Sequence, residues 1–203
     1  MASRRELKRE ALKAKLIEAA GNRIAEGGLA SLRARDVASD VGCALGGIYT
    51  VFDDLDDLIL HVNARTLELL DRELADAVSD RRAGDALKAL ARSYARFAAQ
   101  NRNLWGALFD HRMSDGGPSP DWLLAGHSSL MRYVMPPLAA IQPQLSEETL
   151  HLRARTYFAA VHGIVSMSLQ QRFLGLPDDF LEPELDAFVE VVVDGSVRQR
   201  ESI

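Results

Sequence analysis

The chain has 203 residues, of which 47% are hydrophobic and 26% charged, and its net charge is −5. This size and composition are typical of a soluble globular protein that buries its core as one large domain or two small ones. Its one cysteine excludes an intramolecular disulfide and a cysteine metal cluster, and no run approaches the roughly 20 apolar residues that a membrane helix needs.

Apolar residues recur at three- and four-residue steps along most of the chain, so helices are expected throughout. Gly42 and the Gly-, Pro- and Ser-rich segment 114–120 predict breaks, and Pro136-Pro137 is expected to kink or end its helix. Without strand alternation, the pattern predicts an all-α fold of about nine helices. The expected helices cover residues 8–26, 33–41, 44–51, 54–79, 84–101, 103–113, a segment from 121, 146–174 and 180–199.

The net charge hides an asymmetry along these elements. Residues 1–52 carry nine Lys or Arg against six Asp or Glu, a net of +3, whereas residues 53–203 carry a net of −8. The basic excess is sharpest in residues 1–15. Such a difference predicts two modules with different partners, although a basic helix start is often only a solvated surface.

The helix, glycine turn and helix over residues 33–51 fit a helix-turn-helix. That motif needs a small residue where the helices cross, a residue that tolerates left-handed φ at the turn, and an apolar anchor in the second helix. Ala38, Gly42 and Ile48 supply these at relative positions 0, 4 and 10. Because the triplet follows a basic amphipathic helix and precedes a long one, it predicts a DNA-binding domain.

The segment LRARDVASDVGCALGGIYTVFDDLDDLILHV resembles the DNA-binding domain of tetracycline-repressor (TetR) family regulators. The matching residues are Gly27, Leu32, Arg35, Asp36, Val37, Ala38, Gly42, Gly46, Ile48, Tyr49, Phe52, Asp56 and Leu58. The resemblance implies a helix-turn-helix domain in residues 1–53 and an effector-binding and dimerisation domain in residues 54–203. Two later segments, YARFAAQNRNLWGALF and FAAVHGIVSM, are similar to one TetR subgroup with an aromatic-xxx-His-Gly motif, which here reads Phe158, His162 and Gly163.

By this resemblance, residues 44–51 form the recognition helix that enters the major groove. Its two glycines cost about 1 kcal/mol each in helix stability, and close approach of the backbone to DNA is a compensating gain. Tyr49 and Thr50 can donate to phosphates or bases and Leu45 can touch a thymine methyl, although the Tyr49 ring could equally be core. The predicted DNA-binding residues are Lys13, Arg33, Arg35, Ala44, Leu45, Gly46, Tyr49 and Thr50, with Lys8 and Arg9 as further phosphate contacts.

Four positions depart from the family pattern, which usually has Ser or Thr at 33 and 44, His or Tyr at 51 and Lys at 55. The chain has Arg33, Ala44, Val51 and Leu55. Three of these changes remove a hydrogen-bond donor from the expected phosphate-facing side, which predicts weaker non-specific binding and a shallower salt dependence. A small-molecule-binding protein whose DNA site has decayed is therefore the alternative.

The acidic stretch DDLDD, residues 53–57, has two interpretations. Calcium loops alternate ligands with spacers, turn on a glycine and end on a bidentate Glu, and none of that follows here. Asp54 instead suits an N-cap, with Asp57 as its capping-box partner. The histidines show no paired ligand spacing, and neither a phosphate loop nor a nucleophile elbow occurs, so no metal, cofactor or catalytic site is predicted.

The family analogy places an effector cavity among the C-terminal helices. The candidate lining is aromatic or methionine-rich, which favours a small, mostly apolar molecule, although such residues could equally be plain core, as could His162. The predicted effector-binding residues are Tyr94, Phe97, Trp105, Phe109, Trp122, Met131, Phe158 and His162.

The resemblance also implies a homodimer through a four-helix interface built from the last two helices. The residues expected there are Leu150, Tyr157, Val161, Ile164, Leu169, Leu185, Phe188 and Val192. A two-fold dimer presents two recognition helices to a palindromic operator. Because the N-terminus has no signal-peptide-like apolar segment, the predicted function is a cytoplasmic repressor that binds double-stranded DNA and is released by its effector.

Overall fold

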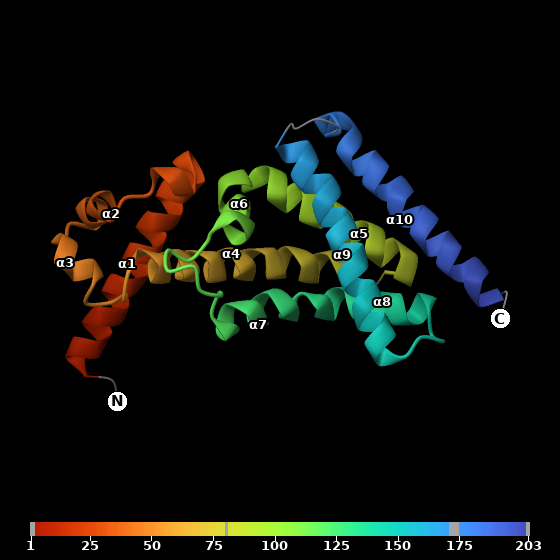
Figure 1. The fold of residues 1–203 in the computed structure, drawn as a ribbon, viewed down its shortest axis with the longest axis horizontal. Coiled ribbons are helices and arrows are strands. Elements are labelled where there is room, and N and C mark those ends of the chain that lie inside the picture. The colour runs from red at the N-terminus through yellow and green to blue at the C-terminus, as the bar shows by residue number, and fades with distance from the viewer. Residues whose placement is uncertain (1–2, 80, 171–174, 202–203) are drawn as a thin grey trace. The chain divides into compact units, whose positions relative to one another are not determined.

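The computed structural model describes residues 3–79, 81–170 and 175–201. Within these ranges every regular element is helical, so the predicted all-α fold with about nine helices is confirmed. A short 3-10 turn, η1 (Leu29–Ser31), follows the first helix. The α-helices are α1 (Arg4–Gly27), α2 (Ala34–Val41), α3 (Leu45–Ile48), α4 (Leu55–Val78), α5 (Ala83–Gln100), α6 (Arg102–Asp110), α7 (Asp121–Ser129), α8 (Met131–Ile141), α9 (Glu147–Leu169) and α10 (Asp178–Glu201) (Figure 1).

The packing of these helices divides the chain into two compact units. The first unit comprises residues 1–68 and 101–124, and the second comprises residues 69–100 and 125–203. The long helix α4 therefore contributes its beginning to the first unit and its end to the second. This division follows packing, whereas the boundary between residues 53 and 54 is a functional one and stays a prediction.

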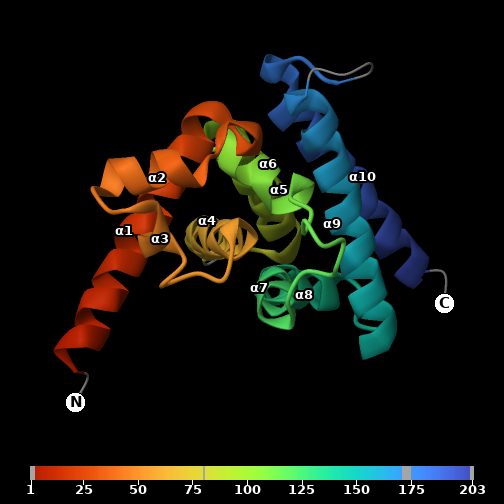
Figure 2. The ribbon, with the colours of Figure 1, turned by 60° about the vertical axis from the view of Figure 1, so that its left-hand side comes forward.

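The core of the first unit is organised by one face of α1. Leu16, Ala20 and Ile24 recur every four residues on that face and are completely buried. α2 packs on α1, and α3 packs on α2 (Figure 2), where Val37 and Ile48 complete the same core. Burying each large apolar side chain contributes about 1.5–3 kcal/mol, so packing, rather than helix propensity, holds these short helices.

Local hydrogen bonding corrects the predicted start of α1. The helix begins at Arg4, four residues before the expected position, because Ser3 and Glu6 form a capping box. The Glu6 N–H donates to Ser3 Oγ at 3.2 Å, and the Ser3 N–H donates to Glu6 Oε2 at 2.5 Å. At the other end of the chain, α9 is described up to Leu169, and the predicted helical residues 171–174 lie outside the described residues.

The Pro136-Pro137 pair does not end a helix, and the other predicted outcome, a kink at this pair, stays a prediction. The break comes earlier, between Ser129 at the end of α7 and Met131 at the start of α8. Both prolines lie inside α8, and each missing N–H removes one helical hydrogen bond. Leu138 and Ile141, in the turn that follows, are buried, and we infer that this burial offsets the loss.

The second unit consists of α5, α8, α9, α10 and the ends of α4 and α7. α9 and α10 lie side by side (Figures 1 and 2), and α10 also packs along α5. Leu181, Leu185 and Val189 of α10 are buried. Three ion pairs follow the α5–α10 contact on successive turns, each worth up to about 1 kcal/mol at the surface. They join Lys88 to Glu190 at 3.2 Å, Arg92 to Asp186, and Arg96 to Glu182 at 3.6 Å.

Candidate nucleic-acid interface and apolar cavity

The turn between α2 and α3 has the backbone conformation that the sequence predicts. Gly42 has φ 73° and ψ 33°, in the left-handed region that glycine adopts without strain. The Gly42 N–H donates to the Ser39 carbonyl at 3.1 Å, and the Cys43 N–H donates to the Ala38 carbonyl at 2.9 Å. This pair of bonds is a Schellman motif, which ends α2 sharply and directs the chain into α3.

α3 is shorter than predicted, and buried side chains anchor it to the core of the first unit. It covers only Leu45–Ile48 and continues as turns to residue 51, because two adjacent glycines lower its helix propensity. Ile48 and Phe52 are buried in the core of the first unit. The opposite side is the α3 face, which we define as the adjacent exposed residues Ala44, Leu45, Gly46, Tyr49 and Thr50.

The alternative interpretation of Tyr49 as a core residue is wrong, because 51% of its surface is exposed. Leu45 is also exposed, at 42%, although its side chain is apolar. Gly46 lies between them in sequence, and a Cβ atom added there would meet nothing within 4 Å. The internal packing of the chain therefore does not require a glycine at position 46.

Two basic residues of α1 lie against the chain segment that follows α3. Arg9 donates from Nε to the Thr50 carbonyl at 3.2 Å and from Nη2 to the Val51 carbonyl at 3.4 Å. Lys13 Nζ lies 5.9 Å from the centroid of the Phe52 ring, a cation–π distance. Sequence reasoning assigned both residues to phosphates, whereas the structure gives each a contact within the protein.

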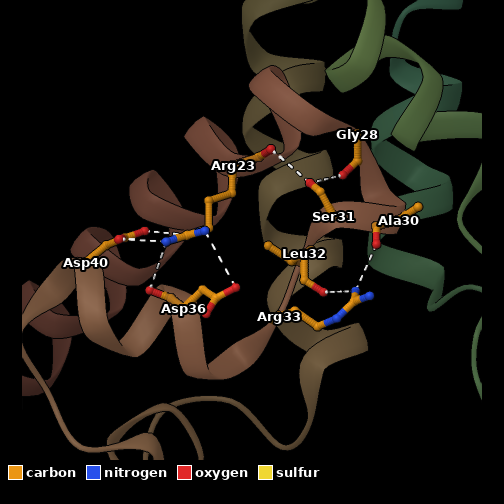
Figure 3. A network of polar contacts seen from close by, with 8 residues as sticks. All are labelled: Arg23, Gly28, Ala30, Ser31, Leu32, Arg33, Asp36 and Asp40. Atoms are coloured by element: carbon orange, nitrogen blue, oxygen red, sulfur yellow. Dashed lines mark hydrogen bonds and ion pairs between the residues drawn. The ribbon is translucent and has the colours of Figure 1, made fainter.

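The two arginines predicted at the start of α2 are placed differently. Arg33 folds back on the preceding turn, where Nη1 donates to the Ala30 carbonyl at 2.8 Å and the Leu32 carbonyl at 2.9 Å (Figure 3). It occupies the N-cap position of α2, and its side chain makes no capping bond there. Arg35 is exposed on the first turn of α2.

Arg23, which the sequence did not single out, fastens α2 to α1. Its Nε and Nη2 donate to the two carboxylate oxygens of Asp40 at 2.5 and 2.8 Å, and its Nη1 lies 3.7 Å from Asp36 Oδ2 (Figure 3). The hydrogen bonds from Arg23 hold the pKa of Asp40 below its usual value. The forked geometry fixes the angle of α2 against α1, and hence the turn that leads to α3.

Two departures from the family pattern have a different meaning in the structure. Val51 is 8% exposed and belongs to the core of the first unit, and Leu55 packs against that core. The prediction that position 51 lies on a phosphate-facing side is wrong, because Val51 is buried there, whereas for the partly buried Leu55 it stays a prediction. Of the three lost donors, only Ala44 lies in the α3 face.

The acidic stretch starts α4, as predicted. The Asp57 N–H donates to Asp54 Oδ1 at 2.7 Å, and Asp57 Oδ2 accepts from the Asp53 N–H at 3.2 Å. Asp56 instead accepts from the Ser114 N–H at 2.8 Å and the Ser114 hydroxyl at 2.6 Å. In the described part of the chain, no group of three His, Cys, Asp or Glu is arranged to hold a metal ion.

The second unit contains a cavity of about 80 Å³. Residues from five helices line it, and the predicted effector residues Tyr94, Met131 and Phe158 are among them. The full lining is Leu74, Leu87, Leu90, Ala91, Tyr94, Leu130, Met131, Val134, Tyr157, Phe158, Val161, Phe188, Val189 and Val192.

The remaining predicted effector residues lie outside this lining. His162 contacts two lining residues: its Nδ1 is 2.8 Å from the Tyr94 hydroxyl, and its ring stacks on Phe158 at 5.8 Å between centroids. Phe97 is buried elsewhere on α5. Trp105, Phe109 and Trp122 belong to the first unit, where Trp105 packs against Phe109 and Trp122 lies 5.4 Å from His61 between ring centroids.

The residues expected at a dimer interface are also placed differently. Leu150, Leu169 and Leu185 are buried within the chain and offer no surface to a partner. The other expected residues are partly exposed, and their place in an interface stays a prediction: Tyr157, Val161, Ile164, Phe188 and Val192. The same two helices also carry an exposed apolar stripe that the sequence prediction did not include. It consists of Leu152, Ala159 and Met167 on α9 and Phe180, Ala187 and Val191 on α10.

A family model described as tetracyclin repressor-like, C-terminal domain, matches residues 87–194, which is more than half of the chain. The chain belongs to the TetR family. The fold is that of TetR-family transcriptional regulators, and the match covers most of the cavity-lining helices. Within the described residues, the TetR chain has no helix with the length and apolar character that a bilayer crossing demands.

Solved structures share the fold at low sequence identity. A protein of unknown function from Rhodococcus sp. RHA1 is 20% identical, with a TM-score of 0.70 over 93% of this chain and 94% of that one. The TetR-family regulator PfmR from Thermus thermophilus is 15% identical, with a TM-score of 0.60 over 89% and 97%. The regulator FadR from Bacillus subtilis, in complex with stearoyl-CoA, is 18% identical, with a TM-score of 0.62 over 90% and 98%. No curated protein matches the chain.

Proposed function

We propose that the chain is a TetR-family transcriptional repressor that binds a palindromic DNA operator as a homodimer and is released by a small, mostly apolar effector. The main support for DNA binding is the α3 face. Its residues are exposed and are supported from below by the buried Ile48 and Phe52. A short helix whose anchors are buried and whose outer face is free suits insertion into the major groove.

The glycine at position 46 also supports the proposal, because it lowers helix stability. Glycine destabilises a helix by about 1 kcal/mol relative to alanine, and nothing in the chain crowds a Cβ at this position. A residue that costs stability without an internal packing reason suits close approach of another molecule's backbone. On the α3 face, between Leu45 and Tyr49, that molecule is DNA in our proposal.

The experiment compares Gly46→Ala with Gly106→Ala, a matched substitution in α6 whose Cβ would only contact Asp110 at 3.5 Å. Both are measured by thermal unfolding and by fluorescence anisotropy with duplex DNA from upstream of the gene. We expect Gly46→Ala to fold at least as stably as the parent and to bind this DNA at least tenfold more weakly. Wild-type binding by Gly46→Ala would refute the placement of α3 in the groove.

The effector part of the proposal rests on the cavity in the second unit. Of its lining residues only the two tyrosines, Tyr94 and Tyr157, carry a polar side-chain atom, which favours an apolar ligand. FadR, which shares the fold, is in complex with stearoyl-CoA. A ligand that prefers one arrangement of the dimer necessarily changes operator affinity, because the two equilibria are coupled.

The dimer part rests on the exposed stripe of α9 and α10. Phe180 and Val191 are 57% and 71% exposed, and Gly163 and Gly195 have open space where a Cβ would be. Exposed apolar side chains beside small residues allow two helix pairs to approach closely. The alternative of a decayed DNA site is weaker than the sequence suggested, since Val51 is a core residue and Leu55 packs against the same core.

A further inference from the structure

The walls of the cavity restrict the charge of its occupant. None of the fourteen lining residues is charged, and twelve of them have no polar side-chain atom. An ionised carboxylate or phosphate placed there would lose its hydration without gaining a counter-ion, which is strongly unfavourable. The cavity therefore selects a neutral molecule.

The hydrogen-bonding direction at Tyr157 is fixed by its neighbour Ser196 on α10. The Ser196 hydroxyl donates its one proton to the Val192 carbonyl at 2.7 Å. With that proton on Val192, we assign the 3.3 Å contact so that the Ser196 oxygen accepts and the Tyr157 hydroxyl donates. With its proton used within the protein, the Tyr157 oxygen can only accept a hydrogen bond from a ligand.

Gln142 adds a second acceptor to the same cluster. Its side chain is buried, with 1% of the residue exposed, and its Nε2 donates to Ser196 Oγ at 2.9 Å. Its Oε1 is buried and has no hydrogen-bond partner. Buried carbonyl oxygens are normally satisfied, so this atom, like the Tyr157 oxygen, lacks a donor.

We infer that the cavity takes a small neutral molecule with an apolar body and one hydrogen-bond donor, such as a phenolic or aliphatic hydroxyl, which donates to the Tyr157 oxygen. The inference rests on the proposed effector role of this cavity and names the chemical class of that effector. A volume of about 80 Å³ holds about five to eight water-sized groups. The part of the ligand that this volume encloses therefore has the size of a simple phenol.

Three probes of similar size separate donor from charge: p-cresol is neutral with a donor, toluene is neutral without one, and benzoate is charged. Their affinities for the full-length protein at pH 7 are measured by calorimetry without DNA. We expect p-cresol to bind about fivefold more tightly than toluene, the effect of one net hydrogen bond, and benzoate to bind most weakly. Benzoate binding as tightly as p-cresol, or no binding of any probe, would overturn the inference.

Two variants test the atoms involved. Tyr157→Phe keeps the ring and removes the acceptor, so the p-cresol preference over toluene should disappear, whereas Tyr133→Phe, which removes a hydroxyl bonded to Asp71 outside the lining, should retain it. Ser196→Ala frees the Tyr157 proton and should raise benzoate affinity relative to p-cresol. An unchanged preference in Tyr157→Phe contradicts the assignment.

Operator binding is measured separately on the same preparations by anisotropy. Loss of the p-cresol preference with intact DNA binding overturns only the ligand class. Donor-selective binding without any specific DNA binding supports the ligand class and overturns the regulator.

Discussion

Replacement of Arg9 by lysine distinguishes two roles for the basic start of α1. Arg9 holds the carbonyls of Thr50 and Val51, shortly after α3, at 3.2 and 3.4 Å. Lysine keeps the positive charge but loses the planar fork that reaches both carbonyls. If Arg9 positions α3, Arg9→Lys must weaken DNA binding, whereas a phosphate contact would tolerate the change.

The magnitude follows from the two bonds. Hydrogen bonds from a charged donor contribute about 1.5–3 kcal/mol, but these two are long, one exposed and the other partly buried, so we expect a combined loss of about 1 kcal/mol. A helix as short as α3 has little stability of its own, so the loss appears as more frequent opening of the segment. Operator affinity should fall about fivefold, and hydrogen exchange should accelerate at the Val51 and Phe52 amides, which bond to Ile48.

The assay is fluorescence anisotropy between 50 and 250 mM salt, with Lys8→Gln as the control for a phosphate contact. Neutralising one phosphate contact lowers the salt slope by about 0.9, so Lys8→Gln should change the slope and Arg9→Lys should not. Wild-type affinity for Arg9→Lys, together with a slope lower by about one in Arg9→Gln, would show that Arg9 contacts phosphate and refute its positioning role.

Further predictions concern stability and assembly. Leu185→Ala should lower the free energy of unfolding by about 2–5 kcal/mol in urea denaturation, because Leu185 is fully buried in the second unit. Val191→Asp at the exposed stripe should leave monomer stability unchanged and weaken self-association in sedimentation; an undiminished dimer would exclude this stripe as the interface. Although burial raises the pKa of Asp56, hydrogen bonds from Ser114 hold it below the usual 3.8. The stabilisation is therefore present above about pH 4 and lost on further acidification, so Asp56→Asn should flatten acid unfolding while Asp53→Asn should not.

The features predicted correctly from sequence are those set by local chemistry. Gly42 predicts its turn because glycine adopts this backbone conformation readily. Asp54 and Asp57 predict the start of α4 because their carboxylates accept hydrogen bonds from the free N–H groups there. The early start of α1 carried a similar signal, Ser3 followed by Glu6 three residues later. That signal was overlooked because the apolar periodicity begins later.

The features predicted wrongly depend on which of two apolar surfaces faces inward. α9 and α10 each carry two stripes of apolar residues, and periodicity cannot tell the stripe that packs within the chain from the one left exposed. For this reason Leu185, which we expected at the interface, is fully buried, whereas Val191, which we did not expect there, is 71% exposed. Trp105 and Trp122 look like cavity residues by type, but chain reversal after α5 carries them into the first unit. The direction of the Tyr157 hydrogen bond depends on Ser196, far away in sequence.

The central claim is that the α3 face reads DNA as part of a two-fold dimer. The most direct measurement is selection of bound sequences from a random duplex pool by the full-length protein at low salt, with Gly46→Ala selected in parallel. We predict that the wild-type chain enriches one palindromic motif with half-sites about one helical turn apart, and that Gly46→Ala does not. A folded, dimeric wild-type protein that enriches no motif would contradict the account.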